Sequence, residues 1–196
     1  STATYYEDIL HKMMDEINLM VKMKGHSNIV SCEDHQVIPH DGSIGWDIII
    51  RMELLTPIVD YQKTHQFTER DVIELGLDIC EALEVCKRYK IIHRDIKPEN
   101  IFVSRTDNYK LGDFGIARTM ENTKGASTKA GTGRYMAPEV YRGERYNDTV
   151  DLYSLGLVLY RYLNENRLPF FLPKSIKSFF LSSKLLISTI INTSFF

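Results

Sequence analysis

Cysteine is scarce in this sequence, and the few positions it takes exclude the usual cysteine-built sites. The 196 residues include three cysteines, Cys32, Cys80 and Cys86, whose separations do not match the ligand spacing of a zinc site. Cys80 and Cys86 fall within a helical pattern of apolar residues. Because no secretory signal peptide opens the sequence, we expect buried free thiols in a reducing, cytoplasmic compartment.

A strong excess of charge is also missing, and so is a long apolar run. The 24 basic and 26 acidic residues give a net charge of −2, and no basic stripe suggests nucleic acid as a partner. Lys174, Lys177 and Lys184 interrupt the apolar C-terminal segment, so no run of about 18 apolar residues predicts a membrane-spanning helix. With 43% hydrophobic and 26% charged residues, the composition is that of a globular protein with a sizeable core.

One stretch places polar side chains that can do chemistry between two apolar runs. Ile91–Ile92 and Ile101–Val103 are each typical of a short buried strand. In the loop between them, Asp95 can accept a proton from a hydroxyl, and Lys97 can neutralise a phosphoryl oxygen in the same space. Asn100 adds a carbonyl oxygen, a ligand type that suits magnesium.

Two further motifs follow this loop in order. Tyr109–Gly112 predicts a strand, and it leads directly into Asp113-Phe114-Gly115. Later comes Gly131–Glu139, which ends in Ala-Pro-Glu. The order H-R-D-x-K-P-E-N, D-F-G, A-P-E resembles the signature set of protein kinases. Lys97, together with the Gly-Thr-Gly before Ala137, resembles the serine/threonine class. The residues of the hinge resemble those of bacterial serine/threonine kinases.

The resemblance implies an α+β, two-lobed kinase fold that is incomplete. Residues 1–169 correspond to a partial kinase domain, with a remnant of the N-terminal lobe to about residue 55 and part of the C-terminal lobe over 56–169. The family's glycine-rich loop and its V-A-I-K strand do not appear before the first helix. Residues 170–196 lose the family pattern, and we expect an atypical tail, truncated or out of frame, that does not pack as a native C-terminal lobe.

By resemblance, five residues take part in phosphoryl transfer. Asp95 orients and deprotonates the substrate hydroxyl, and Lys97 neutralises the transferring phosphoryl group. Asn100 and Asp113 hold the magnesium ion that bridges the phosphates of ATP. Thr132 contacts Asp95 and Lys97 through its hydroxyl.

Five other residues are expected at the nucleotide. Glu16 matches the glutamate that pairs with the lysine anchoring ATP, although the residue pattern alone is also that of a solvated surface carboxylate. Met52 takes the gatekeeper position behind the adenine pocket, and Phe102 lies at the nucleotide. Glu53 and Leu55 belong to the hinge, whose main-chain groups would hydrogen-bond adenine.

The apolar spacing also predicts the elements that carry these residues. The expected helices and strands are Tyr5–Lys24, Asn28–Val37, Trp46–Glu53, a helix from the N-cap Thr68 to Tyr89, and Asp148–Leu163. In the first helix the apolar stripe consists of Ile9, Met13, Ile17 and Met20. Asp151 in the last helix matches the family aspartate that caps the catalytic-loop backbone.

The segment from Gly115 to Pro138 matches the family's activation segment. The candidate phosphorylation sites in it are Thr119, Thr123, Ser127, Thr128 and Thr132, and a merely flexible loop is the alternative for each of them except Thr132. Arg94 could receive such a phosphate.

The function implied is a serine/threonine protein kinase that uses ATP and magnesium on protein substrates. This chain by itself is expected to be weak or inactive, because a lysine to pair with Glu16 is missing. The alternative is a non-catalytic, kinase-like binding module. The intact set of Asp95, Asn100 and Asp113 favours an active kinase of which this sequence is an incomplete part.

Overall fold

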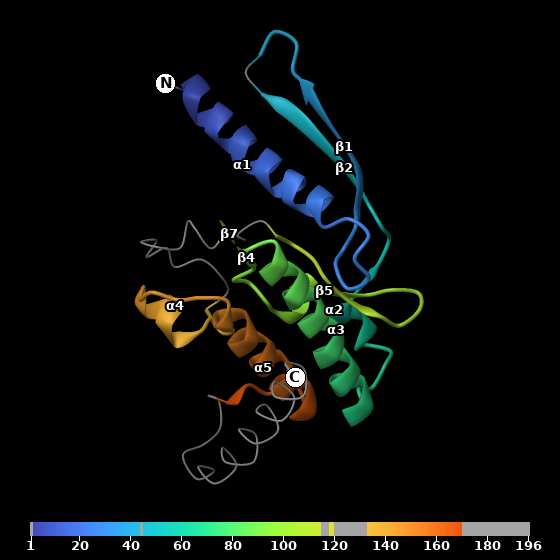
Figure 1. Cartoon of the computed structure of the whole chain (residues 1–196). Coiled ribbons are helices and arrows are strands. Elements are labelled where there is room, and N and C mark those ends of the chain that lie inside the picture. Colours follow the sequence, from blue (N-terminus) through green and yellow to red (C-terminus); the bar gives the residue numbers. More distant parts are fainter. Residues whose placement is uncertain (1, 44, 115–117, 120–132, 170–196) are drawn as a thin grey trace.

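The computed structural model describes residues 2–43, 45–114, 118–119 and 133–169. Figure 1 shows an upper part built from one long helix and a hairpin, and a lower part built mainly from helices. The elements are α1 (Thr2–Lys22), β1 (Cys32–Pro39), β2 (Trp46–Met52), β3 (Thr56–Pro57), α2 (Ile58–Tyr61), α3 (Glu69–Arg88), β4 (Ile91–Ile92), the 3-10 turn η1 (Pro98–Asn100), β5 (Ile101–Val103), β6 (Tyr109–Leu111), β7 (Arg118–Thr119), α4 (Pro138–Arg142) and α5 (Thr149–Leu163).

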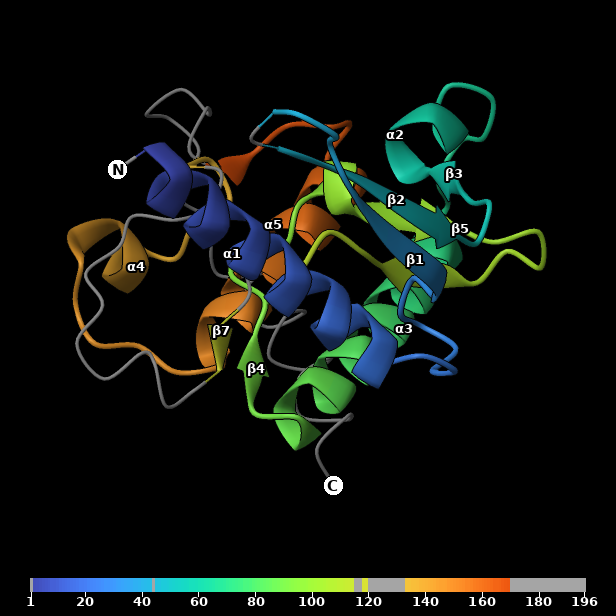
Figure 2. The same cartoon turned by 90° about the horizontal axis from the view of Figure 1, so that it is seen from above.

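Helix α1 packs onto the rest of the molecule through its last turns. Ile17 and Met20 of α1, together with Met23 just after the helix, are at most 5% exposed and repeat every three residues, so they lie on one side. The expected stripe is wrong at Met13, which is 42% exposed. In Figure 1 the N-terminal end of α1 extends away from the lower part of the molecule. Figure 2, a view from above, places α4 and α2 on opposite sides of α1.

The hairpin begins later than the sequence pattern predicts. Strands β1 and β2 pair antiparallel, with Val37 opposite Ile48. Residues 28–30 do not join this hairpin, because they pair with β6 in the lower part. The Val30 amide donates to the Leu111 carbonyl at 2.9 Å, and the Leu111 amide donates to the Asn28 carbonyl at 2.8 Å. This short segment therefore joins the upper part to the strand that leads to Asp113.

Helix α3 starts where the sequence predicts, because Thr68 forms a capping box with Asp71. The Thr68 hydroxyl accepts from the Asp71 amide, and the Asp71 carboxylate accepts from the Thr68 amide. The buried face includes Val72, Leu75 and Ile79, all at most 2% exposed. Strands β3, β5 and β6 form a three-stranded antiparallel sheet beside this helix.

Two apolar clusters hold the lower part together. The main core joins α1, α3, β5, β6 and α5. We call the other one the second cluster; its buried members are Ile92, Ala137, Val140 and Val150, and Tyr146, Met136 and Tyr153 pack against it. Across the part of the chain that the structure describes, no helix is both long and apolar enough to cross a membrane.

Candidate active site

Asp151 of α5 holds the loop that carries Asp95. Its Oδ2 accepts from the His93 amide at 2.8 Å, and its Oδ1 accepts from the Arg94 amide at 2.7 Å. Burial raises the pKa of Asp151 to about 6, while the two amide donors act in the opposite direction. The predicted capping role of Asp151 is confirmed, and at neutral pH the group is a buried carboxylate satisfied by two main-chain N–H groups.

His93 fixes the other side of the loop as a neutral imidazole. The side chain is fully buried, and burial lowers its pKa to about 4. Its Nε2 lies 3.0 Å from the carbonyl oxygen of Gly112, which can only accept, so Nε2 carries the proton. Its Nδ1 is then the acceptor for the Asp95 amide at 3.3 Å. The ring also meets Phe114 edge-on, with centroids 4.7 Å apart. One side chain therefore links the loop to the segment that carries Asp113.

Asp95, Lys97 and Asn100 converge as the sequence predicts. Lys97 Nζ donates to Asp95 Oδ2 at 2.5 Å, and Asn100 Nδ2 donates to the same oxygen at 3.1 Å. Asn100 Nδ2 also donates to the Asp95 carbonyl at 2.9 Å. Because these bonds occupy the amide nitrogen of Asn100, its Oδ1 is the atom that can face a cation. The side chains of Asp95 and Lys97 are only 11% and 18% exposed, so their ion pair is weakly screened.

Asp113 comes directly after Gly112, a residue that contacts Asn100. The Gly112 amide donates to the Asn100 carbonyl at 2.9 Å, which brings the start of the Asp113 segment to the catalytic loop. Asp113 is exposed and has a positive φ of 59°. Glu16 of α1 lies close enough that the Asp113 carboxylate adds to burial in raising the Glu16 pKa. Two neighbouring carboxylates favour a cation between or beside them.

This donor set suits magnesium rather than a fully protein-bound metal. Among the described residues, no group of three or more histidine, cysteine, aspartate or glutamate side chains could hold a metal ion. Magnesium commonly binds through one or two carboxylates and completes its shell with water and substrate phosphates. The exposed carboxylate of Asp113 and the available Oδ1 of Asn100 match that pattern.

The hinge residues connect the upper part to β6 by side chains that the sequence did not reveal. Glu53 accepts from the Ser31 amide at 2.6 Å and from Lys110 Nζ at 2.8 and 2.9 Å. The Glu53 side chain is therefore bonded within the protein, and the Glu53 amide donates to the Ser31 carbonyl at 3.2 Å, so the main-chain carbonyl of Glu53 remains for the predicted adenine contact. Met52, at the end of β2, is 40% exposed, and Leu55 is half-buried.

Phe102 lies against the glycine that precedes Asp113. A Cβ atom on Gly112 would lie 2.9 Å from Phe102 Cε2 and 2.8 Å from Val30 Cγ2. Only a residue without a side chain fits there unless its neighbours move. Phe102, Gly112 and Val30 thus form a close junction at the base of the expected nucleotide position.

Some predicted residues lie outside the described part of the chain. They are Thr132, the candidate phosphorylation sites Thr123, Ser127 and Thr128, and the tail 170–196. Other contacts at the site were missed from sequence: Lys110 with Glu53, Asp78 accepting from the Tyr109 amide at 2.7 Å, and Tyr146 with Arg94. Local periodicity carries no signal for these pairs, because their partners are 31 or more residues apart.

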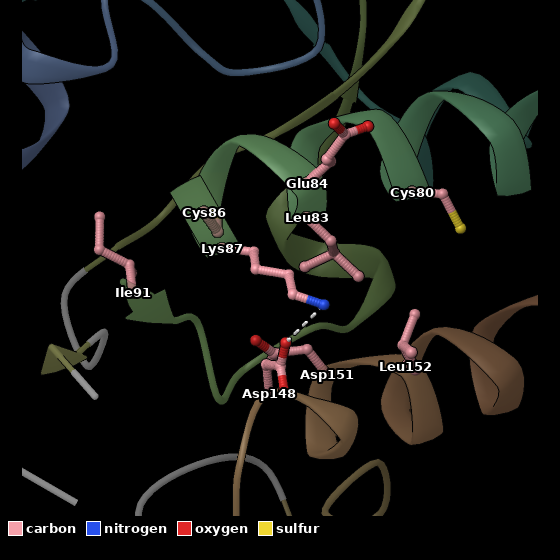
Figure 3. Close-up of a pocket in the computed structure, with 9 residues that line it drawn as sticks. All are labelled: Cys80, Leu83, Glu84, Cys86, Lys87, Ile91, Asp148, Asp151 and Leu152. Carbon is pink, nitrogen blue, oxygen red and sulfur yellow. Dashed lines mark ion pairs between the residues drawn. The ribbon is translucent and has the colours of Figure 1, made fainter. Parts of the chain in front are cut away.

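A small cavity lies behind the loop, between α3 and α5. Figure 3 shows Asp151 at this cavity, close to Asp148, which pairs with Lys87 at 3.6 Å. Its volume is about 30 Å³, enough for a water molecule but far too small for a nucleotide. The nucleotide is therefore expected on the opposite side of the loop, where Asp95, Asn100 and Asp113 meet.

Comparison with known proteins agrees with these observations. A family model described as the protein kinase domain matches residues 2–190, which extends past residue 169. The chain is 35% identical over 158 residues to serine/threonine-protein kinase Nek2 of Mus musculus, covering 76% of this chain and 35% of the relative. It is 44% identical over 98 residues to serine/threonine-protein kinase PknB of Mycolicibacterium smegmatis, covering 48% of this chain and 16% of the relative. The chain thus spans about a third or less of the length of these relatives.

Proposed function

The chain belongs to the protein kinase domain family, and from that premise we propose that it carries the catalytic machinery of an ATP-dependent serine/threonine protein kinase. The observation that supports this best is the convergence of Asp95, Lys97 and Asn100 beside the start of Asp113. Lys97, and relatives named serine/threonine-protein kinases, support the serine/threonine class. The three free cysteines suit a reducing compartment, and we propose a cytoplasmic location.

Asp95 acts on the protein substrate. Its carboxylate accepts the proton of the attacking serine or threonine hydroxyl and orients that oxygen. Lys97, paired with the same carboxylate, supplies positive charge where the phosphoryl group passes. Asn100 holds Asp95 in place through Nδ2, so the base has a fixed direction.

Asn100 and Asp113 would hold magnesium, whose charge neutralises the phosphates of ATP. The chain's contribution is to fix the two ligands with respect to Asp95. His93 and the Gly112–Asn100 hydrogen bond do this by tying the two segments together. Main-chain groups of Glu53 and Leu55 would receive adenine.

The test uses this chain and an extended chain. The extended chain carries, before residue 1, a glycine-rich strand pair and a lysine-bearing strand taken from a complete kinase domain. With radiolabelled ATP, magnesium and serine, threonine or tyrosine peptides, the extended chain should label serine or threonine. The 196-residue chain without the added strands is the comparison, and it should give less transfer than the extended chain.

The decisive variant is Asp95→Asn in the extended chain. Transfer should fall at least about 100-fold, while magnesium-dependent ATP binding changes little. Asp60→Asn, at an exposed surface position, is the matched control. An Asp95→Asn rate equal to that of the unsubstituted chain would refute the role. ATP binding without transfer by any version would instead indicate a kinase-like binding module.

A further inference from the structure

Tyr146 reaches the catalytic loop from a distant segment. It lies between α4 and α5, and its ring packs against the second cluster. Its hydroxyl oxygen accepts a hydrogen bond from Arg94 Nη1 at 3.2 Å, across 52 positions of sequence. The ring therefore packs between elements, whereas the hydroxyl forms a hydrogen bond with Arg94, the residue next to Asp95.

Arg94 is a residue whose exact placement matters for the loop. It is 5% exposed and has a φ of 67°, a left-handed conformation that is uncommon for a residue with a side chain. Its amide is held by Asp151, and its side chain contacts Tyr146. Because the chain turns at Arg94, the direction of Asp95 depends on how firmly this turn is held.

We propose that Tyr146 is a positioning residue for catalysis: its hydroxyl fixes the Arg94 guanidinium beside Asp151 and thereby holds the turn that aims Asp95. This inference rests on the proposed phosphoryl transfer for its kinetic consequence, but its structural part does not. Tyr146 acts through Arg94 and not by direct contact with nucleotide or substrate.

The charge of Arg94 gives the proposal a signature that mere packing would not produce. The groups facing the Asp151 carboxylate are Arg94, which favours its ionised form, Asp148 at the start of the same helix, and Cys86 of α3. Lys87 pairs with Asp148 at 3.6 Å. If the Tyr146 hydroxyl is removed, Arg94 is held less firmly and stabilises the ionised carboxylate less. Asp151 should then bind its proton at higher pH.

The first arm of the test is structural and uses the 196-residue chain. Carbon-13 NMR should follow the titration of the Asp151 carboxyl group in the unsubstituted chain, in Tyr146→Phe and in Tyr153→Phe. Tyr153 packs against the same cluster, so it controls for the loss of a hydroxyl at that place. We expect an upward shift of the Asp151 titration in Tyr146→Phe only. An unchanged titration in Tyr146→Phe, or the same shift in both variants, overturns the proposal.

A second variant shows whether the hydroxyl acts through Arg94. Arg94→Met should also raise the pH at which Asp151 titrates, and adding Tyr146→Phe to it should change nothing more. Additive shifts in the double variant would mean that the hydroxyl acts independently of the guanidinium, and the proposal would fail.

The kinetic arm uses the extended chain. Tyr146→Phe should lower kcat roughly tenfold, as expected for one lost hydrogen bond to a charged group, with the KM for ATP unchanged. The acid limb of the rate profile should move to higher pH. A change in KM alone contradicts positioning. If the unsubstituted extended chain transfers no phosphate, the proposed function fails, and the NMR arm still decides whether Tyr146 holds the loop.

Discussion

Ion pairs in the upper and lower parts of the molecule differ in solvent exposure. The exposed pairs lie on the surface, whereas the nearly buried pair in the lower part orients side chains of the candidate active site. In the β1–β2 hairpin, Arg51 and Glu33 meet at 3.2 Å with side chains that are 68% and 48% exposed. In the catalytic loop, Lys97 and Asp95 meet at 2.5 Å with side chains that are 18% and 11% exposed. Water screens the first pair and leaves it free to rearrange, whereas the second pair fixes a direction.

The two parts meet at a junction made of main-chain and side-chain bonds. Val30 and Asn28 bond to Leu111 through the main chain. The Glu53–Lys110 pair, 22% and 14% exposed, adds a charged link beside it. The nucleotide position expected from the sequence lies at this junction, so its shape depends on both parts. The following predictions test the contrast, from the largest effect to the smallest.

Asp151→Ala should have the largest effect. It removes the acceptor for the His93 and Arg94 amides, both of which are buried. Two unsatisfied N–H groups should lower the free energy of unfolding by about 3 kcal/mol. The control is Asp148→Ala, whose partly exposed pair with Lys87 should be worth less than about 1 kcal/mol. Urea unfolding measures the free energy of unfolding of both variants. Equal losses would show that the buried Asp151 stabilises the fold no more than the partly exposed Asp148 does.

The same loop predicts opposing effects of pH. Burial lowers the pKa of His93 to about 4 from its ordinary value of 6.5, so its contribution to stability is complete above pH 6.5 and is lost as pH falls toward 4. Burial raises the pKa of Asp151 to about 6 from its ordinary value of 3.8, so its contribution to stability rises as pH falls from 6 toward 3.8. Between about pH 4 and 6 the two slopes oppose each other.

Asp151→Asn should expose the His93 slope. Its free energy of unfolding should fall on acidification more steeply than that of the unsubstituted chain, by up to about 1.4 kcal/mol per pH unit. Urea unfolding at several pH values from 4 to 6.5 measures the slopes. Identical slopes for the two proteins would contradict the opposed titrations.

Gly112→Ala tests the junction. The new methyl group would press on Val30 from the upper part and Phe102 from the lower part. We expect a loss of about 1–2 kcal/mol in the free energy of unfolding, together with weaker nucleotide binding. At Gly133 a Cβ would meet nothing within 4 Å, so Gly133→Ala is the matched control. If both substitutions behave alike in urea, the close packing at Gly112 does not matter.

Double-mutant cycles should give the smallest effects and the sharpest contrast between the two parts. For Glu53→Gln with Lys110→Met, we expect a coupling energy of about 1–2 kcal/mol, because both side chains are largely buried. For Arg51→Gln with Glu33→Gln, the coupling should be about 0.5 kcal/mol or less. Urea unfolding of the seven proteins, which are the unsubstituted chain, four single variants and two double variants, supplies both values. A larger coupling in the hairpin would reverse the comparison.

Much of the fold could be predicted because its signals are local. The cap at Thr68 and the apolar spacing from Val72 to Cys86 define α3 without any distant contact. The close grouping of Asp95, Lys97 and Asn100 was equally accessible, because these residues lie within one short loop. The catalytic and ligand roles of these residues stay predictions.

What the sequence could not supply depends on contacts between distant segments. The pattern over residues 28–37 is that of one strand, yet its first residues pair with β6. Met13 belongs to the predicted apolar stripe and is nevertheless exposed, because periodicity shows which face of a helix is apolar but not how far the partner surface extends. Likewise, Lys110 looks like any polar residue of a strand until Glu53 is placed beside it.

The left-handed backbone at Arg94 and Asp113 has a consequence for selection. Glycine would adopt φ values of 67° and 59° at these positions more readily than the residues present. The Arg94 side chain is buried and bonded to Tyr146, so its loss would cost more than the strain it relieves. Asp113 is exposed, and a laboratory selection for heat resistance alone would therefore favour glycine there, which would delete a carboxylate from the proposed catalytic centre. Selection for turnover would restore this carboxylate along with its backbone strain.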